Sequence, residues 1–337
     1  MNPTPSTPPT IESSTAATVP LSVWATAQQA PRTQRAGRYL PGTTAHPARM
    51  QPALAAHAIA TLTEPGQVVF DPMCGAGTTL VEALRAGRHA VGIDVEPRWA
   101  SLSRDNIAHT ARHGVSGYGQ VITADARNLP DALPPGSAEQ LAGQVALVLT
   151  SPPYGLSTHG QVTANPTRGV VKADHRYAPA TRAANLAYQP LHRLLAGLSR
   201  ILAGCIPLLA PGGHIVLTTR PWRQYGELVD LPGAVTQAGI RAGLVPVQRC
   251  VALLAGLRDG QLVTRPSFFQ RQLVAKARAA GQPWHAIVHE DVLIFRVQPK
   301  CWSSGKSKQL QAEPKCSSAS LSGLDTWVRE EPEGVAG

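Results

Sequence analysis

Short apolar runs alternate with amphipathic segments along most of the 337-residue chain. The apolar runs are too short for helices and predict strands, whereas the segments between them repeat every 3.6 residues and predict helices. Because parallel strands need crossover connections, this alternation predicts an α/β domain with a mostly parallel seven-stranded sheet, helices on both faces and a terminal antiparallel hairpin. The predicted strands cover residues 68–71, 89–94, 119–125, 145–150, 214–223, 244–255 and 289–297.

The two ends of the chain differ in composition from this domain. Residues 1–35 are rich in Pro, Thr, Ser and Ala, and residues 299–337 are polar and interrupted by Gly, Ser and Pro. Neither segment carries enough apolar residues to form a core, so both are predicted to be disordered. We therefore expect the folded domain to cover residues 36–298.

The sequence VVFDPMCGAGTTL at residues 68–80 predicts a strand, a tight glycine turn and the first turn of a helix. Such a turn lets a ligand approach the backbone closely and offers it free N–H groups. A phosphate-binding P-loop needs Lys before Ser or Thr, and here Gly77 precedes Thr78. A dinucleotide site favours a third small residue at position 80, where this chain has the larger Leu80. Both of these ligand classes therefore fit the turn poorly.

A ligand with an amino-acid moiety fits the turn better. Asp71, at the end of the strand, would accept hydrogen bonds from an ammonium group, while the turn amides would meet a carboxylate. S-adenosylmethionine has this chemistry, and the alternative is an ordinary strand-to-helix turn with no ligand. The turn residues expected to contact the cofactor are Cys74, Gly75, Gly77 and Thr78.

Three of the predicted strands end in an aspartate, at Asp71, Asp94 and Asp125. The carboxyl ends of parallel strands form the ligand crevice of open α/β sheets. The spacing of Asp94 from Asp71 suits a contact with a ribose hydroxyl, although an aspartate there would also suit a helix cap. We expect Asp125 to accept a hydrogen bond from the adenine amino group.

The strand at residues 145–150 leads into Ser151, Pro152, Pro153 and Tyr154. Consecutive prolines fix φ and remove N–H donors, which leaves a stiff backbone rich in acceptors. The Ser151 hydroxyl and the Pro152 carbonyl would hold the two hydrogens of a planar amino group, and Tyr154 would stack on a base. In isolation such a turn more often forms a polyproline loop. Directly after a buried strand, and beyond a glycine turn, it is a catalytic candidate.

DPMCGAGTT followed by TSPPY resembles the S-adenosylmethionine-dependent amino-methyltransferases of nucleic acids, in particular the N4-cytosine and N6-adenine DNA methylases. The resemblance covers roughly residues 38–297 and implies a Rossmann-like methyltransferase fold with S-adenosylmethionine as cofactor. HPARM, ahead of the glycine turn, is similar to the family's extra cofactor-contacting segment, which makes His46 a cofactor-binding candidate. SPPY, as opposed to DPPY, is associated with N4 of cytosine, so Ser151 favours cytosine in DNA as the target.

Two other functions stay open. DPMCGAGT is also similar to the tRNA and rRNA guanine-N2 methyltransferases, although these have Asn or Asp where Ser151 stands. A non-catalytic nucleic-acid-binding protein with a degenerate cofactor site is the third reading, although every expected acidic and glycine position is filled. The sequence does not specify the target site, a restriction partner or the oligomeric state.

The net charge of +10 adds to this picture, because a basic protein suits a polyanionic partner. Basic residues gather at 155–190 and 256–287, interleaved with aromatic ones, so both insertions are candidate target-recognition regions. A solvated loop and a core-packed helix are the respective alternatives. The five cysteines form no CxxC pair, which predicts neither a metal site nor a disulfide framework. We expect no membrane partner and a cytoplasmic location, because no signal or membrane-spanning segment stands out.

Overall fold

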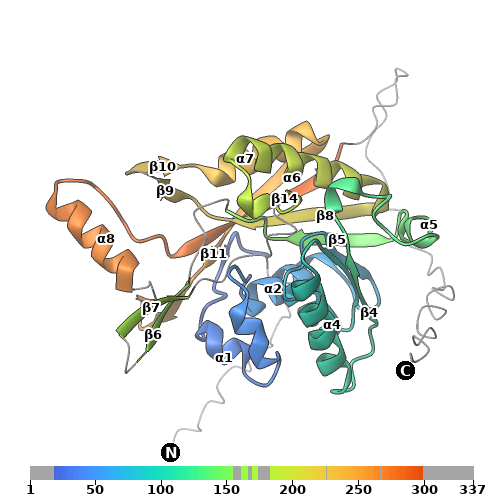
Figure 1. Ribbon diagram of the computed structural model, residues 1–337, viewed down its shortest axis with the longest axis horizontal. Coiled ribbons are helices and arrows are strands. Elements are labelled where there is room, and N and C mark those ends of the chain that lie inside the picture. Colours follow the sequence, from blue (N-terminus) through green and yellow to red (C-terminus); the bar gives the residue numbers. More distant parts are fainter. Residues whose placement is uncertain are drawn as a thin grey trace, which may run out of the picture.

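The computed structural model describes residues 19–154, 161–165, 169–173, 183–224, 226–265 and 268–298. The central sheet has eight strands: β1 (Val23–Trp24), β2 (Val68–Asp71), β3 (His89–Asp94), β4 (Gly119–Thr123), β5 (Val145–Thr150), β8 (Leu209–Thr219), β11 (Leu244–Leu253) and β14 (His289–Val297). Their order is β1-β11-β14-β8-β5-β2-β3-β4 (Figure 1). The five strands from β8 to β4 are parallel, and β14 runs antiparallel to both β8 and β11. This topology confirms the predicted Rossmann-like fold.

Helices cover both faces of the sheet (Figure 1). The larger ones are α2 (Pro52–Leu62), α3 (Thr78–Arg85), α4 (Pro97–Ala111), α6 (Leu191–Cys205) and α7 (Leu231–Arg241). Successive residues of β2 show how the two layers share one sheet: Val69 packs with the α2 and α3 side, and Phe70 with the α6 and α7 side. The shorter helices are α1 (Pro31–Arg35), η1 (Pro41–Ala45), η2 (Ala126–Asn128), α5 (Ser137–Leu141), η5 (Leu186–Tyr188) and η6 (Ile206–Leu208).

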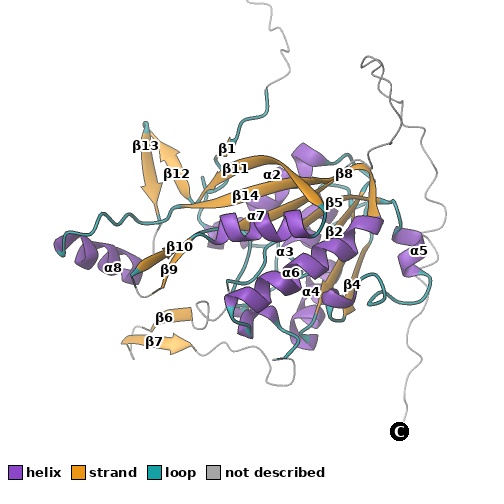
Figure 2. Cartoon of the chain, turned by 90° about the horizontal axis from the view of Figure 1, so that it is seen from above, coloured by secondary structure: helices purple, strands orange, loops and turns teal. Residues whose placement is uncertain are grey.

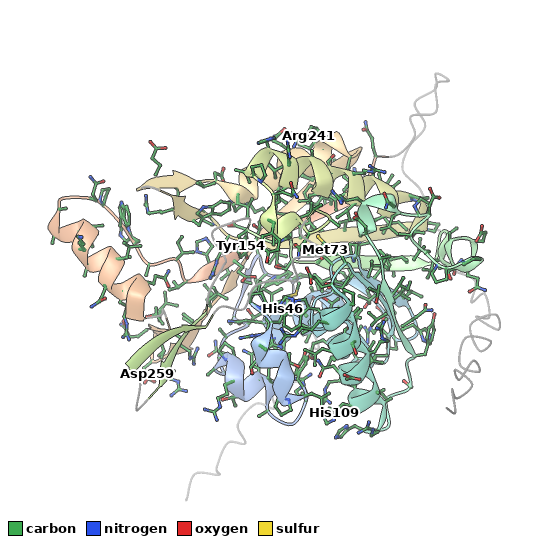
Figure 3. The ribbon with its side chains drawn as sticks, in the orientation of Figure 1. His46, Met73, His109, Tyr154, Arg241 and Asp259 are labelled. Atoms are coloured by element: carbon green, nitrogen blue, oxygen red, sulfur yellow. The ribbon has the colours of Figure 1, made fainter. Side chains whose placement is uncertain are left out.

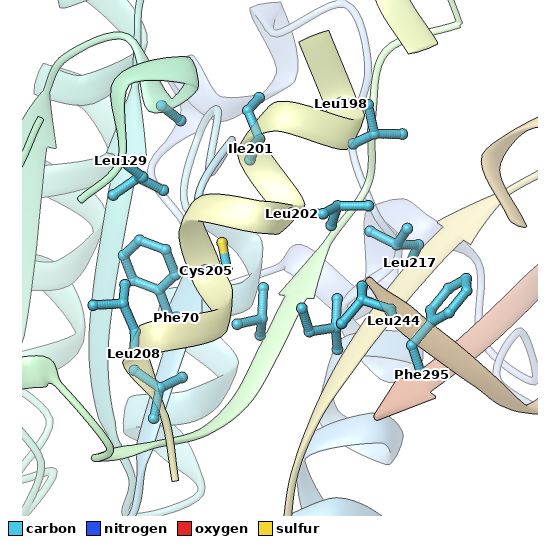
Figure 4. Packing of buried hydrophobic residues seen from close by; sticks show 14 of the residues in the cluster. Phe70, Leu129, Leu198, Ile201, Leu202, Cys205, Leu208, Leu217, Leu244 and Phe295 are labelled. Carbon is cyan, nitrogen blue, oxygen red and sulfur yellow. The ribbon is translucent and has the colours of Figure 1, made fainter. Parts of the chain in front are cut away.

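The α6 layer illustrates the larger of the two cores (Figure 4). Leu198 and Leu202 of α6 are fully buried in one cluster with Phe70 and Leu217 of the sheet. Within the described chain, the stretch Leu191–Leu208 is long and apolar enough to cross a membrane by length and composition alone. Its packing against the sheet accounts for that apolar composition.

Three antiparallel hairpins and one further helix extend from the sheet. They are β6 (Gln161–Asn165) with β7 (Gly169–Ala173), β9 (Trp222–Gln224) with β10 (Glu227–Val229), β12 (Ala255–Arg258) with β13 (Gln261–Thr264), and α8 (Phe268–Ala279). Figure 2 places all of them at the end of the molecule away from α5, and Figure 1 shows the same for β6, β7, β9, β10 and α8. The predicted basic insertions contribute to this end, although much of 155–190 lies outside the described residues.

The sheet has one strand more than predicted, and this strand falls in the arm that was expected to be disordered. Val23 of β1 pairs in parallel with Val251, and the Trp24 side chain is buried against the ring of His57. The prediction of disorder over residues 1–35 is therefore wrong for β1 and α1. Two features hold this segment in place: the buried ring of Trp24, and the backbone N–H and C=O groups that β11 would otherwise leave unpaired at the edge of the sheet. Residues 1–18 and 299–337 lie outside the described residues.

Candidate active site

The glycine turn joins β2 to α3 as predicted, and its two glycines adopt left-handed backbone angles. The φ angle is 52° at Gly75 and 81° at Gly77. A Cβ atom on Gly75 would lie 2.7 Å from Nε2 of His46, and one on Gly77 would lie 2.3 Å from Oγ of Ser103. Both positions therefore require glycine for conformation and for space.

Two carboxylates lie at the strand ends beside this turn, Asp71 buried and Asp94 half-buried. Oδ2 of Asp94 accepts a hydrogen bond of 2.8 Å from the Gly75 amide, and its Oδ1 accepts one of 2.8 Å from the Glu96 amide. Oδ1 of Asp71 accepts a hydrogen bond of 3.0 Å from the Met73 amide. Burial raises the pKa of Asp71 to about 6 and that of Asp94 to about 7. The turn is thus tied to the end of β3, and Asp94 serves both as a turn anchor and as a pocket residue.

His46 packs directly on the glycine turn, although it lies far upstream in the sequence. Its ring meets the ring of Trp99 edge-on at 4.7 Å, and its Nδ1 accepts a 3.3 Å hydrogen bond from the Ala48 amide. Burial lowers its pKa to about 3, so the ring is neutral at physiological pH. In Figure 3, His46 and Met73 both lie at the centre of the molecule. The HPARM segment therefore forms one wall of the pocket.

Asp125 also faces the pocket, but it already has a partner. Its Oδ2 accepts a 2.6 Å hydrogen bond from Nη2 of Arg127, and its Oδ1 accepts 3.0 Å bonds from the backbone amide and Nε of the same residue. Burial alone would raise the pKa of Asp125, but the hydrogen bonds and charge of Arg127 outweigh it and lower the pKa. Arg127 therefore fixes the orientation in which Asp125 would meet a ligand.

One cavity of about 110 Å³ brings most of the predicted residues together. The predicted residues that line it are His46, Asp71, Cys74, Gly75, Thr78, Asp94, Asp125, Ser151 and Pro153. Gly77 lies behind the lining, against Ser103. Cys74 is a structural residue as well, because it packs in the core and its Sγ lies 3.9 Å from Oγ of Ser103.

The Ser-Pro-Pro-Tyr corner stands at the border of a second, larger cavity. That cavity has a volume of about 840 Å³, and its lining includes Ser151, Tyr154, Arg220 and Glu290. The guanidinium carbon of Arg220 lies 5.6 Å from the centre of the Tyr154 ring, and the ring of Trp222 lies 6.4 Å from it. Burial raises the pKa of Tyr154, so its hydroxyl stays protonated. Ser151 thus contributes to both cavities and Tyr154 to the second, whereas Pro152 is buried behind them and its side chain lines neither.

Several pocket residues escaped the sequence analysis. Oε1 of Glu96 accepts a 2.9 Å hydrogen bond from Nδ2 of Asn185, and both residues line the first cavity. Nη1 of Arg35 donates a 3.3 Å hydrogen bond to Oγ1 of Thr78. Glu96 follows Asp94 by two positions, so its closeness to the predicted strand end is a local signal in the sequence. Nothing local to Asn185 or Arg35 indicates these contacts, because each forms across the fold.

Metal ligation has no candidate in the described ranges. No group of three or more His, Cys, Asp or Glu side chains in that part of the chain is arranged to hold a metal ion. Cys74, Cys205 and Cys250 are free and buried.

The model of a DNA methylase family matches residues 5–105. This span contains the HPARM segment, the glycine turn and Asp94. Over these residues, the match agrees with the predicted resemblance to the DNA methylases. It also supports the predicted cofactor, S-adenosylmethionine, which a DNA methylase uses as its methyl donor.

The names of two curated relatives describe them as enzymes that methylate tRNA. The chain is 35% identical over 92 residues to a tRNA (guanine(10)-N2)-dimethyltransferase of Methanothermobacter thermautotrophicus, which is 27% of this chain and 23% of the relative. It is 33% identical over 115 residues to the enzyme of the same name from Methanocaldococcus jannaschii, which is 34% of this chain and 31% of the relative. The matched part is thus under a third of the length of either relative.

Among solved structures, the fold is similar to TrmN from Thermus thermophilus, with a TM-score of 0.44, 18% identity, and coverage of 79% of this chain and 53% of that one. It is also similar to magnesium protoporphyrin IX methyltransferase from Synechocystis with bound S-adenosylmethionine, with a TM-score of 0.40, 13% identity, and coverage of 73% and 77%. These likenesses are distant, so the strand order carries the assignment of the fold.

Proposed function

We propose that the protein transfers a methyl group from S-adenosylmethionine to the exocyclic amino group of a base in nucleic acid. One observation carries this proposal: Ser151 lines both the cavity formed by the glycine turn and the larger cavity beside it. A side chain in that position touches the donor on one side and the acceptor on the other. Methyl transfer requires the two reactants to meet in line, and positioning of this kind supplies much of the rate enhancement.

The residues of the first cavity suit the cofactor. Gly75 lines the cavity and lets the His46 ring pack directly on the turn, where a methyl group would collide with it. Asp94 has a half-buried carboxylate suited to ribose hydroxyls, and Asp71 has a buried one suited to the ammonium group. Arg127 holds Asp125 toward the adenine side. When bound, the cofactor supplies an activated methyl group on a positively charged sulfur.

The Ser151 corner then activates the amino nitrogen. The lone pair of an exocyclic amine is delocalised into the ring, which makes the nitrogen a weak nucleophile. Hydrogen bonds from its two protons to Ser151 and the Pro152 carbonyl favour a pyramidal nitrogen and stabilise the charge that develops on it. The base must leave a duplex to reach this pocket, at a cost of a few kcal/mol that stacking on Tyr154 helps to offset.

The finer proposal is N4 of cytosine in DNA. The serine of Ser-Pro-Pro-Tyr and the match to a DNA methylase family support it. The second candidate is N2 of guanine in tRNA, which the names of the curated relatives support. For either substrate, α8 suits the phosphate backbone, because it carries Arg271, Lys276 and Arg278 and no acidic residue.

A labelling experiment separates these substrates. Purified protein with radiolabelled S-adenosylmethionine is offered duplex DNA from a methylation-deficient host and unmodified tRNA in parallel. We expect label in DNA that digestion assigns to N4-methylcytosine. Label in tRNA alone would establish the second candidate, and label in neither, despite cofactor binding by calorimetry, would favour the non-catalytic reading.

A further inference from the structure

The larger cavity contains an acidic residue that the proposed mechanism leaves unused. Glu290 lies on β14, opposite Ala252 of β11, and only 8% of its surface is exposed. Its Oε2 atom is buried and has no hydrogen-bond partner within the described chain. The next residue, Asp291, also has a buried oxygen without such a partner, Oδ2, but its Oδ1 accepts a 2.8 Å bond from Nε of Arg249. A buried carboxyl oxygen without a partner is costly in a folded protein, so an unmet partner is expected at Glu290.

The surroundings of Glu290 indicate what that partner is. The cavity is lined by Glu290 and Arg220 together with Ser151 and Tyr154, and Arg220 lies over the Tyr154 ring. A base stacked on Tyr154 with its amino group at Ser151 would share this cavity with Glu290 and Arg220. At about 840 Å³ the cavity is in the usual range for small-ligand pockets.

We propose that this cavity receives the target cytosine, that the Glu290 carboxyl group donates a hydrogen bond to N3, and that Arg220 donates one to O2. This inference rests on the proposed function and assigns the residues that choose the base. Cytosine presents an amino donor followed by two acceptors along one edge, and Ser151, Glu290 and Arg220 supply the complementary groups. Adenine offers no acceptor in place of O2, and guanine presents an N–H donor beside its amino group.

The protonation of Glu290 agrees with a donor role. Burial raises its pKa to about 7, and the nearby charge of Asp291 raises it further, while the charge of Arg220 lowers it. A neutral carboxyl is therefore accessible near neutral pH. Binding of the base would favour the protonated carboxyl further, because N3 of cytosine accepts a hydrogen bond from it.

The test pairs a change in the protein with a change in the base. The target site is first located by sequencing the modified bases, and a duplex with that site is made with cytosine or with 3-deazacytosine, which has a C–H in place of N3. Loss of one buried hydrogen bond lowers kcat/KM about 10- to 100-fold. We expect this loss for Glu290→Leu on cytosine and for the wild type on 3-deazacytosine. On 3-deazacytosine the contact with N3 is already absent, so kcat/KM of Glu290→Leu should be less than about threefold below that of the wild type on the same duplex.

Two further variants separate base contact from structural damage. Glu290→Gln keeps a donor and should retain activity within about tenfold of the wild type. Glu64→Leu, an exposed glutamate before β2, is the matched control and should change neither activity nor stability. The affinity for S-adenosylmethionine should be the same in all of them.

The inference is overturned if Glu290→Leu loses equal activity on both duplexes, or if the wild type methylates 3-deazacytosine as well as cytosine. The second outcome needs no variant, so a folding failure of Glu290→Leu leaves the test intact. Methylation of guanine in RNA alone would overturn the cytosine assignment. A wild type that labels no nucleic acid would refute the proposed function itself, which is a different result.

Discussion

Alanine at position 77 provides the sharpest test of the glycine turn. Gly77 is the N-cap residue of α3 and has a φ angle of 81°. A Cβ atom there would lie 2.3 Å from Oγ and 3.2 Å from Cβ of Ser103, a residue of α4 that is fully buried. Gly77→Ala therefore combines an unfavourable backbone angle with a steric collision that forces α3 and α4 apart.

The chain offers a matched control for the unfavourable backbone angle alone. Gly66, between α2 and β2, has the same φ angle of 81°, and a Cβ atom there would meet nothing within 4 Å. Gly66→Ala should lower the free energy of unfolding by about 1 kcal/mol, from the backbone angle alone. Overpacking adds about 1–3 kcal/mol in a tight core, so Gly77→Ala should lose about 2–4 kcal/mol in total.

Urea unfolding followed by circular dichroism measures both losses, and calorimetry measures the affinity for S-adenosylmethionine. We expect Gly77→Ala to weaken cofactor binding at least tenfold and Gly66→Ala to leave it unchanged. Adding Ser103→Ala to Gly77→Ala removes the Oγ atom and should recover part of the stability. Equal losses for the two glycine variants would refute the collision with Ser103.

Three further predictions concern charge and pH. Burial raises the folded-state pKa of Asp71 to about 6 and those of Asp94 and Glu290 to about 7, above the unfolded values. The folded state then holds more protons, so stability is greatest in acid and falls as pH rises through these pKa values, by up to about 1.4 kcal/mol per pH unit per group. Melting temperatures between pH 5 and 8 should show this fall, and Asp94→Asn should make it shallower; a rise in the same range would contradict it. Arg127→Met should weaken S-adenosylmethionine binding about threefold to tenfold in titration calorimetry, because it frees the side chain of Asp125. Unchanged affinity would mean that Arg127 does not position that carboxylate.

The parallel part of the sheet and its turns were predictable because their signals are local. An apolar run followed by a glycine turn predicted β2, the turn and α3, and the aspartates at the strand ends predicted the edge where the first cavity lies. The Ser-Pro-Pro-Tyr corner follows β5 in the same way. In each case the residues that specify the element are neighbours in sequence.

The elements that the sequence analysis missed depend on contacts between distant residues. Trp24 is buried because β1 adds to β11, more than two hundred positions later, and the composition of the arm gave no sign of it. Glu290 and Arg220 likewise come together at Tyr154 only because β14 lies beside β8. Within the sequence, Glu290 is one polar residue at the start of an apolar strand.

The most direct measurement of the central claim is the methylated nucleoside formed by Ser151→Ala. DNA is incubated with each enzyme and S-adenosylmethionine, digested, and analysed by mass spectrometry, while calorimetry records cofactor affinity. The account predicts N4-methylcytosine from the wild type and a rate about a hundredfold lower for Ser151→Ala. Cofactor affinity should change by less than about tenfold, because the substitution removes one hydroxyl from the lining of the first cavity. An unchanged rate for Ser151→Ala would contradict the assignment of Ser151 to the junction of donor and acceptor.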